Sequence, residues 1–431
     1  MRMRIPASNR ARVALIIALL ALAFAVRVGA AVIWEARLPV GARFAFPDSE
    51  TYWTLGQRLA TGAPYSYGPH EARVFRMPGY PWVLSIVFRC CGADTPTLAA
   101  RVLGALLGTM AIAGVAWMAW QLFGPAASLA TAVLAAVYPG AIVMSVLLLS
   151  ESPFCAVMTW QLALGVAAWN SPAIRSRGVL SLLFGLVGGM ATWIRPSWLL
   201  FTPIACLIGL TSRRSRGDCW QFAWCAVMGL VLTMAPWWWR NYTITGHWVP
   251  TTLQVGASLY DGWNPLADGG SDMRFVDRFL DEQRRADEAA LAAGQTLDAT
   301  FEWRLDQRHH AAAVAWALGY PGQVLRLMGV KFLRMWNVWP NEPAFRGWWV
   351  RCVVLIGYVP LMIAAAWGAV TIVSRRGGAH MFCLLPAVYL TLLHVIFVSS
   401  LRYREPAMLP LIVLAAAVMV CERTSHGERP S

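Results

Sequence analysis

The sequence predicts an all-α polytopic membrane protein. Of its 431 residues, 58% are hydrophobic and only 13% are charged, and the mean hydropathy is +0.51. A soluble globular protein carries about 25% charged residues, so this composition indicates a chain that lies in lipid. Apolar runs able to cross about 30 Å of hydrocarbon predict about ten helices. They lie near 13–33, 97–121, 126–145, 153–170, 178–194, 197–211, 219–239, 347–373, 380–399 and 405–421.

The charges and cysteines exclude several other classes of protein. The net charge is +14, but no basic stripe lies in a soluble-looking segment, so we expect no nucleic-acid partner. The nine cysteines have no metal-ligand spacing and imply no disulfide framework. No H-E-x-x-H, Walker loop, G-x-G-x-x-G or G-x-S-x-G is present. The first apolar run is too long for a signal-peptide core, so we expect a retained first span.

The placement of arginine predicts the orientation of the spans. With ten spans, one membrane face receives both chain ends and the basic loops between spans, and this face is cytoplasmic by the positive-inside rule. Its arginines are Arg2, Arg4, Arg10, Arg12, Arg175, Arg177, Arg213, Arg214, Arg216, Arg375 and Arg376. Two long segments, 34–96 and 240–346, then lie outside. We expect short interfacial helices in both, including the amphipathic stretch YPGQVLRLMGVKFLRMW, and a single membrane-embedded domain over 1–431.

Arginines also gather at the outer face, against the positive-inside bias. They are Arg76, Arg101, Arg195, Arg240, Arg402 and Arg404. Each one alone could reach lipid phosphates from the interface or cap a helix. As a set they indicate a site for a phosphate-bearing lipid, because arginine binds phosphate through paired, charge-assisted hydrogen bonds. Arg27 is the main arginine inside a span, and we expect it to reach the outer interface.

Two carboxylates stand close together in FPDSETYW, Asp48 and Glu50. The following residues predict a short helix that ends at Gly62, with Asp48 or Ser49 as its N-cap. Glu151 in LLLSESPF either caps a span or pairs with an arginine. The two carboxylates also leave open a site for Mg²⁺ or Mn²⁺, since both ions prefer oxygen ligands.

The order of motifs along the chain carries a family resemblance. PDSETYWTLGQRLATGAPYS is followed by FRMPGYPWVLS, ARVLGALLG, YPGAIVMSVLLLSESPF, ATWIRPSWLL, APWWWRNYTITGHWVP, YPGQVLRLMGVKFLRMW and LRYREPAMLPLIVLAAA. This series resembles bacterial members of the C-type glycosyltransferase superfamily. Within that superfamily it is similar to the protein O-mannosyltransferase-like group, with the rhizobial galacturonosyltransferases and the aminoarabinose transferase of lipid A. The resemblance runs nearly from end to end.

The resemblance implies a transferase in the bacterial inner membrane that uses a polyprenyl-phosphate-linked sugar and has a periplasmic active site. By motif position, Asp48 matches the catalytic carboxylate, and Arg76 falls where relatives often have a basic residue that contacts the lipid phosphate. Met77-Pro78 stands where many relatives have a double proline. The chain is also short, so acceptor specificity housed in a soluble C-terminal domain of relatives does not carry over. The acceptor could be a glycolipid, a polysaccharide or a protein hydroxyl.

The chemistry of such a donor needs few groups. A lipid phosphate is already a good leaving group, so the reaction needs a base for the acceptor hydroxyl and cations for the departing phosphate. We expect no required cofactor, although a divalent cation remains open. The expected site comprises Asp48 as base, Glu50 and Glu151 as supporting or metal-binding groups, Arg76, Arg195, Arg240, Arg402 and Arg404 on the phosphate, and Tyr52, Tyr80, Asn241 and Tyr403 in the donor or acceptor pocket. The alternatives are a polyprenyl-lipid transporter or flippase and a non-catalytic envelope assembly protein.

Overall fold

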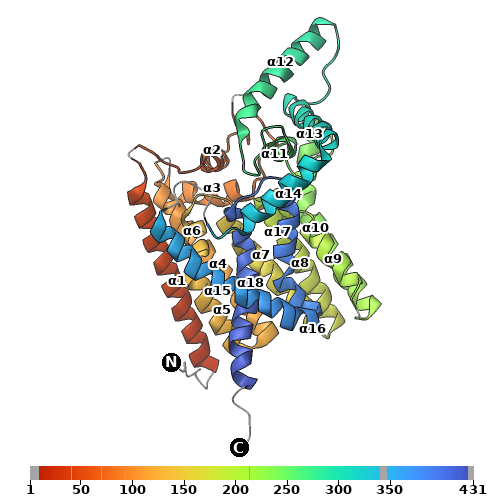
Figure 1. The fold of residues 1–431 in the computed structure, drawn as a ribbon. Coiled ribbons are helices and arrows are strands. Elements are labelled where there is room, and N and C mark those ends of the chain that lie inside the picture. Colours follow the sequence, from red (N-terminus) through yellow and green to blue (C-terminus); the bar gives the residue numbers. More distant parts are fainter. Residues whose placement is uncertain are drawn as a thin grey trace, which may run out of the picture.

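The structure is a computed structural model that describes residues 9–425 except 40, 69, 93, 213 and 340–346. The described residues are almost entirely helical and form no strand, apart from one isolated bridge between Tyr67 and Ala72. Figure 1 shows a bundle of long helices with a layer of shorter helices at one end. Of the arginines used to predict the orientation, Arg2, Arg4 and Arg213 lie outside the described residues.

Within the described residues, seven helices, or helix runs, are long and apolar enough to cross a membrane. They are α1 (Asn9–Arg37), α4 (Thr97–Phe123), α7 (Glu151–Asn170), α8 (Ile174–Ile194), α10 (Arg216–Thr245), α15 (Trp348–Gly368, continued by the π-helix η4, Ala369–Val373, and by α16, Ser374–Arg376) and α18 (Leu401–Ser425). The prediction of an all-α, multi-pass membrane protein is therefore confirmed.

The other three predicted spans are helical but are broken or shorter. The stretch 126–145 forms α5 (Pro125–Val137) and α6 (Pro139–Val146), which meet at an angle of 58° and count together as an eighth candidate span. The break falls at Tyr138, because Pro139 removes a backbone donor and disfavours helical geometry in the residue before it. The stretches 197–211 and 380–399 form η1 (Pro196–Trp198) with α9 (Phe201–Leu210), and η5 (Gly378–Cys383) with α17 (Leu385–Ile396).

The break between α5 and α6 explains why Arg27 is buried inside the bundle. This arginine is fully buried, and its guanidinium donates to the backbone oxygens of Ala135 (3.2 Å) and Ala136 (3.3 Å) at the end of α5. Those carbonyls have lost their helical partners because the helix stops there. The expectation that Arg27 reaches the outer interface is therefore wrong: it caps a helix end inside the bundle.

The two long segments between spans build the layer at one end of the bundle (Figure 1). The first supplies α2 (Pro47–Thr61) and α3 (Gly79–Cys91), and the second supplies α11 (Val255–Gly262), η2 (Met273–Phe275), α12 (Val276–Ala292), α13 (Phe301–Gly319) and α14 (Pro321–Trp336). The start of α1 and the end of α18 lie at the opposite end, as the predicted topology requires. We call this layer the outer layer.

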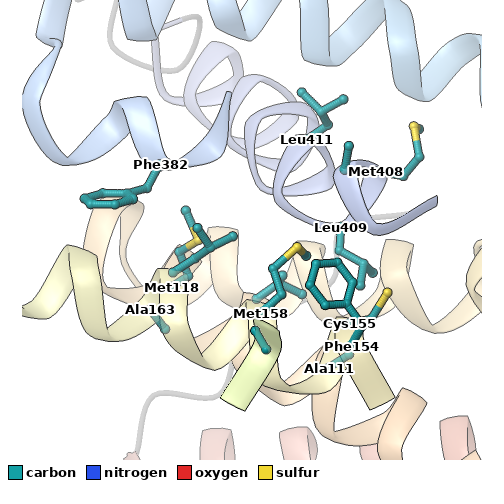
Figure 2. Packing of buried hydrophobic residues seen from close by; sticks show 14 of the residues in the cluster. Ala111, Met118, Phe154, Cys155, Met158, Ala163, Phe382, Met408, Leu409 and Leu411 are labelled. Atoms are coloured by element: carbon teal, nitrogen blue, oxygen red, sulfur yellow. The ribbon is translucent and has the colours of Figure 1, made fainter. Parts of the chain in front are cut away.

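The core of the bundle is built around α18. Figure 2 shows Met408, Leu409 and Leu411 of this helix against buried side chains of α4 and α7, with Phe382 of η5 beside them. The apolar part of α18 is the most buried among the candidate spans of the described residues, at 83%, followed by that of α7 at 72%. The buried packing of α18 therefore fixes the position of its first turn, which faces the outer layer.

The outer layer is tied to the turn before α18 by Lys331 of α14, the only lysine of the sequence. Its side chain is fully buried, and Nζ donates to the backbone oxygen of Ile396 (2.8 Å) at the end of α17. A cation is favourable there because the carbonyls at a helix C-terminus are negative. Burial lowers the pKa of Lys331 to about 8, and the nearby Asp261 opposes that shift.

Candidate active site

Asp48 lies in the first turn of α2 and is held by two arginines from distant parts of the chain. Its Oδ1 accepts from Nη2 of Arg76 (2.6 Å) and its Oδ2 from Nη2 of Arg402 (2.9 Å). The helix begins at Pro47 after Phe46, and no side chain caps it, so the predicted N-cap role of Asp48 or Ser49 is wrong. The predicted end at Gly62 is confirmed, with φ of 73°.

The environment of Asp48 keeps it ionised. Burial alone would raise its pKa, but the attraction of Arg76 and Arg402, together with their hydrogen bonds, outweighs burial and lowers the pKa to about 2. An opposite charge within hydrogen-bond distance favours the charged form of a carboxyl in this way. Asp48 is therefore a carboxylate at neutral pH, and a weak proton acceptor while both arginines hold it.

A second carboxylate, Glu151, lies on the other side of Arg402. Glu151 is buried at the start of α7, and its Oε1 is 2.8 Å from Nη1 of Arg195 and 3.7 Å from Nε of Arg402. Of the two roles expected for Glu151, the structure shows the pairing with arginine; no side chain caps α7. Arg402 thus lies between two carboxylates that come from α2 and α7.

Three of the expected pocket residues surround these charges. The Arg76 guanidinium lies over the ring of Tyr52, 5.2 Å from its centre, and Tyr52 meets Tyr80 edge to face. Tyr403 accepts from Nη2 of Arg402 through its hydroxyl oxygen (2.9 Å). Its ring also lies 5.3 Å from the guanidinium of Arg195. The structure therefore brings these tyrosines together with Asp48 and Glu151.

Three expected site residues do not join this cluster. Arg240 packs against the rings of Tyr65 and Trp237 and donates to the backbone oxygen of Arg73 (3.0 Å). Asn241 is buried and donates to backbone oxygens in the turn after α10. Neither residue contacts Asp48 or Arg402, and both brace the segments around them. Glu50 is exposed on α2, beside but apart from the ion pairs of Asp48.

A cavity of about 780 Å³ opens next to this cluster. Its walls come from α1, α6, α15, the start of α18 and the segment 38–46, and they are mostly apolar. Its charged and hydroxyl-bearing lining residues include Arg37, Arg402, Arg404, Glu405, Tyr138, Tyr358 and Ser400. Of the five arginines expected to bind the phosphate, Arg402 and Arg404 therefore line this apolar cavity.

Glu405 is a site residue that the sequence reasoning missed. Its Oε1 is 3.5 Å from Nε of Arg404, and its side chain is almost fully buried at the cavity wall. Gly140 leaves room for it, since a Cβ at that position would lie 2.0 Å from its Oε2. The signal was present in LRYREP, where the acid directly follows the second arginine.

Arg101 forms a separate ion pair at the same level. Its Nε lies 2.5 Å from Oε2 of Glu35, which also accepts from the hydroxyl of Thr97, and Nη1 donates to the backbone oxygen of Val146 (2.7 Å). Neither Arg101 nor Glu35 lines the cavity. In the part of the chain that the structure describes, no three His, Cys, Asp or Glu side chains cluster in a way that could hold a metal ion.

Comparison with known proteins agrees with this architecture. Residues 75–239 match the sequence profile of the dolichyl-phosphate-mannose-protein mannosyltransferase family. The archaeal oligosaccharyltransferase AglB from Archaeoglobus fulgidus, in complex with an inhibitory peptide and a dolichol-phosphate, superposes with a TM-score of 0.57 at 13% identity. The match covers 96% of this chain and 52% of that one. No curated protein matches the chain.

Two further structures are similar. The same oligosaccharyltransferase in complex with zinc and sulfate gives a TM-score of 0.58 at 14% identity, over 95% of this chain and 50% of the other. ArnT from Cupriavidus metallidurans, bound to undecaprenyl phosphate, gives 0.47 at 15% identity, over 97% and 79%. This chain spans about half the length of the oligosaccharyltransferase.

The fold is therefore that of the C-type glycosyltransferases, which confirms the fold class predicted from the motifs. Within that class the central part of the chain, from Phe75 to Trp239, carries the pattern of the dolichyl-phosphate-mannose-protein mannosyltransferases. The chain thus resembles membrane glycosyltransferases that use lipid-linked sugars. Asp48 and Arg402 lie outside the matched range and join Arg76 only through the fold.

Proposed function

We propose that this protein transfers a sugar from a polyprenyl-phosphate-linked donor to a hydroxyl group of a cell-envelope acceptor. The observation that carries the proposal is the place of Arg402, which lines the apolar cavity and donates to Asp48. A lipid phosphate in the cavity and a carboxylate that can accept a proton would therefore meet at one residue.

The cavity suits the donor lipid on chemical grounds. Its apolar walls favour a hydrocarbon chain over water, and Arg402 and Arg404 are among its lining residues. Guanidinium binds phosphate oxygens in pairs and stays charged at every physiological pH. Arg76 and Arg195 share the carboxylates of Asp48 and Glu151 with Arg402, so these three guanidinium groups exceed the two carboxylates by one positive charge.

Asp48 would act as the base in a single displacement. The acceptor hydroxyl gives its proton to the Asp48 carboxylate, and its oxygen forms a bond to the anomeric carbon of the sugar. The bond from that carbon to the phosphate oxygen breaks, and the electron pair leaves with the lipid phosphate, whose added charge the arginines stabilise. This direct attack inverts the anomeric centre. The resulting Asp48 carboxylic acid then loses its proton to water.

The proposed location is the bacterial inner membrane, with the outer layer in the periplasm and both chain ends in the cytoplasm. It is supported by the arginines near the ends of spans opposite the outer layer, Arg175, Arg177, Arg214, Arg216, Arg375 and Arg376, which follow the positive-inside rule. We propose no bound cofactor for the transfer step. The acceptor is a glycolipid, a polysaccharide or a protein of the envelope.

Complementation of a deletion strain tests the proposal. Mass spectrometry of envelope glycolipids from that strain would show which sugar is lost, and wild type should restore it. Asp48→Asn should be inserted and folded but should not restore it. The matched control is Asp281→Asn on the exposed face of α12, which removes an outer-layer carboxylate far from the cavity and should restore it. Restoration by Asp48→Asn would instead support a lipid transporter or an assembly protein.

A further inference from the structure

Arg402 connects the cavity with the carboxylate of Asp48. Of the two arginines that pair with Asp48, it is the one that also lines the cavity. Its Nη2 donates both to Asp48 and to the hydroxyl oxygen of Tyr403, and its Nε faces Glu151 at 3.7 Å. Asp48 itself does not line the cavity. A ligand in the cavity can therefore influence Asp48 through Arg402.

The two arginines on Asp48 differ in what else is within their reach. Arg76 lies against the rings of Tyr52 and Phe75, and its backbone oxygen accepts from the hydroxyl of Tyr65, so it is fixed among outer-layer residues. Arg402 is the partner that faces the ligand space. The phosphodiester of a lipid-linked sugar carries one negative charge and two free oxygens, as a carboxylate does, and guanidinium binds such oxygens in pairs, so the donor can compete with Asp48 for Arg402.

We propose that a lipid phosphate in the cavity takes Arg402 away from Asp48, so that Asp48 becomes an effective base only when the donor is bound. This inference rests on the proposed function and adds an order of events to it. The charged groups that act on Asp48 are Arg76 and Arg402, and the ring of Tyr52 lies under the Arg76 guanidinium. After the exchange Asp48 keeps Arg76 as its one cationic partner.

The exchange has a clear chemical consequence. Held by both arginines, Asp48 has a pKa of about 2 and accepts a proton poorly. Loss of one opposite charge raises the pKa of a carboxyl, and a base works better as its pKa approaches the ambient pH. The acceptor hydroxyl is thus deprotonated with the donor in place. When the lipid phosphate leaves, Arg402 pairs with Asp48 again, and the pKa of Asp48 falls back.

Carboxyl-directed labelling tests the exchange without any assay of transfer. A water-soluble carbodiimide reacts with the protonated form of an accessible carboxyl, so its rate reports on both the pKa and the ion pairing of Asp48. The purified protein in nanodiscs would be labelled in the presence of an amine nucleophile, with and without undecaprenyl phosphate. Peptide mass spectrometry gives the modification of each carboxyl, and undecaprenol controls for the lipid chain.

Glu35 provides an internal reference. Its side chain is 32% exposed against 31% for Asp48, and it is also paired with an arginine, but Arg101 does not line the cavity. We expect undecaprenyl phosphate to increase the labelling rate of Asp48 by about tenfold, the effect of removing one of two opposite charges. The rate at Glu35 should not change, and undecaprenol should change neither.

The Arg402→Gln variant completes the test. Its Asp48 should label fast without any lipid, undecaprenyl phosphate should add little, and an unchanged rate at Glu35 would show that the variant is folded. An unchanged or slower rate at Asp48 of the wild type on adding undecaprenyl phosphate would overturn the exchange. This failure is distinct from that of the proposed function, which is decided by whether Asp48→Asn restores the lost sugar.

Discussion

The guanidinium of Arg404 lies over the ring of Tyr358, with its central carbon 3.8 Å from the ring centre. The hydroxyl of Tyr358 donates to the backbone oxygen of Trp336 (3.2 Å), and Arg404 donates to the backbone oxygens of Met335 (3.3 Å) and Asn337. The end of α14 thus holds both partners, and a helix of the outer layer sets the angle at which Arg404 meets the cavity.

This stacking predicts how substitutions of Tyr358 affect lipid binding. Tyr358→Leu removes a cation–π interaction of about 0.5–2 kcal/mol, so undecaprenyl phosphate should bind roughly two- to thirtyfold more weakly. Tyr358→Phe keeps the ring and loses only the hydroxyl, and it should bind nearly as wild type does. Titration of undecaprenyl phosphate into protein in nanodiscs measures both. Equal losses in the two variants would show that the hydroxyl, and not the ring, holds Arg404.

Arg240 and Arg404 should behave differently, although both were expected to bind the lipid phosphate. Arg404→Gln removes a guanidinium from the cavity wall and should weaken undecaprenyl phosphate binding by about tenfold or more, the scale of a charge-assisted hydrogen bond. Arg240→Gln removes the brace on Tyr65 and Arg73 and should lower the melting temperature while leaving binding nearly unchanged. Weak lipid binding by a folded Arg240→Gln variant would return Arg240 to the phosphate site.

Glu302 gives the outer layer a pH dependence. Its carboxylate accepts from the backbone N–H groups of Arg73 (2.9 Å) and Val74 (3.1 Å), and burial raises its pKa to about 6. Because the folded-state pKa lies above the unfolded one, the folded state binds the proton more tightly. Its contribution to the free energy of unfolding is therefore greatest below the unfolded pKa and falls as the pH rises through 6.

Thermal unfolding in detergent at a series of pH values measures this effect. The melting temperature of wild type should fall relative to that of Glu302→Gln between about pH 4.5 and pH 7. Asp306, which accepts from the backbone N–H of Gly256 and has a pKa raised by burial to about 6, should show the same trend when replaced by Asn. Parallel curves for wild type and Glu302→Gln would contradict the prediction.

The two cysteines at the end of α3 can test the membrane orientation. Cys90 and Cys91 are exposed, and α3 belongs to the outer layer, whereas Cys155, Cys206, Cys219 and Cys383 are buried. A membrane-impermeant maleimide should label intact spheroplasts, and replacement of both Cys90 and Cys91 by Ser should remove most of that label. Labelling that requires permeabilised cells would place the outer layer in the cytoplasm.

Metal dependence is also testable. Both oxygens of Asp48 accept from arginines and Glu50 is exposed, so we expect the acidic pair not to bind an ion. Transfer activity in membranes should therefore persist after treatment with EDTA and should not rise on addition of Mg²⁺ or Mn²⁺. Loss of activity with EDTA, and recovery with one of these ions, would instead indicate a cation supplied together with the donor.

The fold was largely predictable because the length of each apolar run shows whether it can cross a bilayer as a helix, and because the motifs occur in a recognisable order. The proximity of Asp48 and Arg76 could also be predicted, since both belong to one outer segment. Arg402 could be placed only at a membrane face, because its contact with Asp48 spans most of the chain. The contacts of each arginine side chain could not be predicted from the sequence. Arg240 packs against Tyr65 and Trp237, and Arg27 donates to the backbone oxygens at the break before Pro139.

The burial of Lys331 gives the molecule a built-in reporter. The only lysine side chain of the sequence is shielded from solvent between α14 and the end of α17, so an amine-directed reagent meets no accessible lysine in the folded protein. Once exposed, an ordinary lysine would react freely. The rate of acylation at this one position would therefore report how often the outer layer separates from the membrane-embedded bundle.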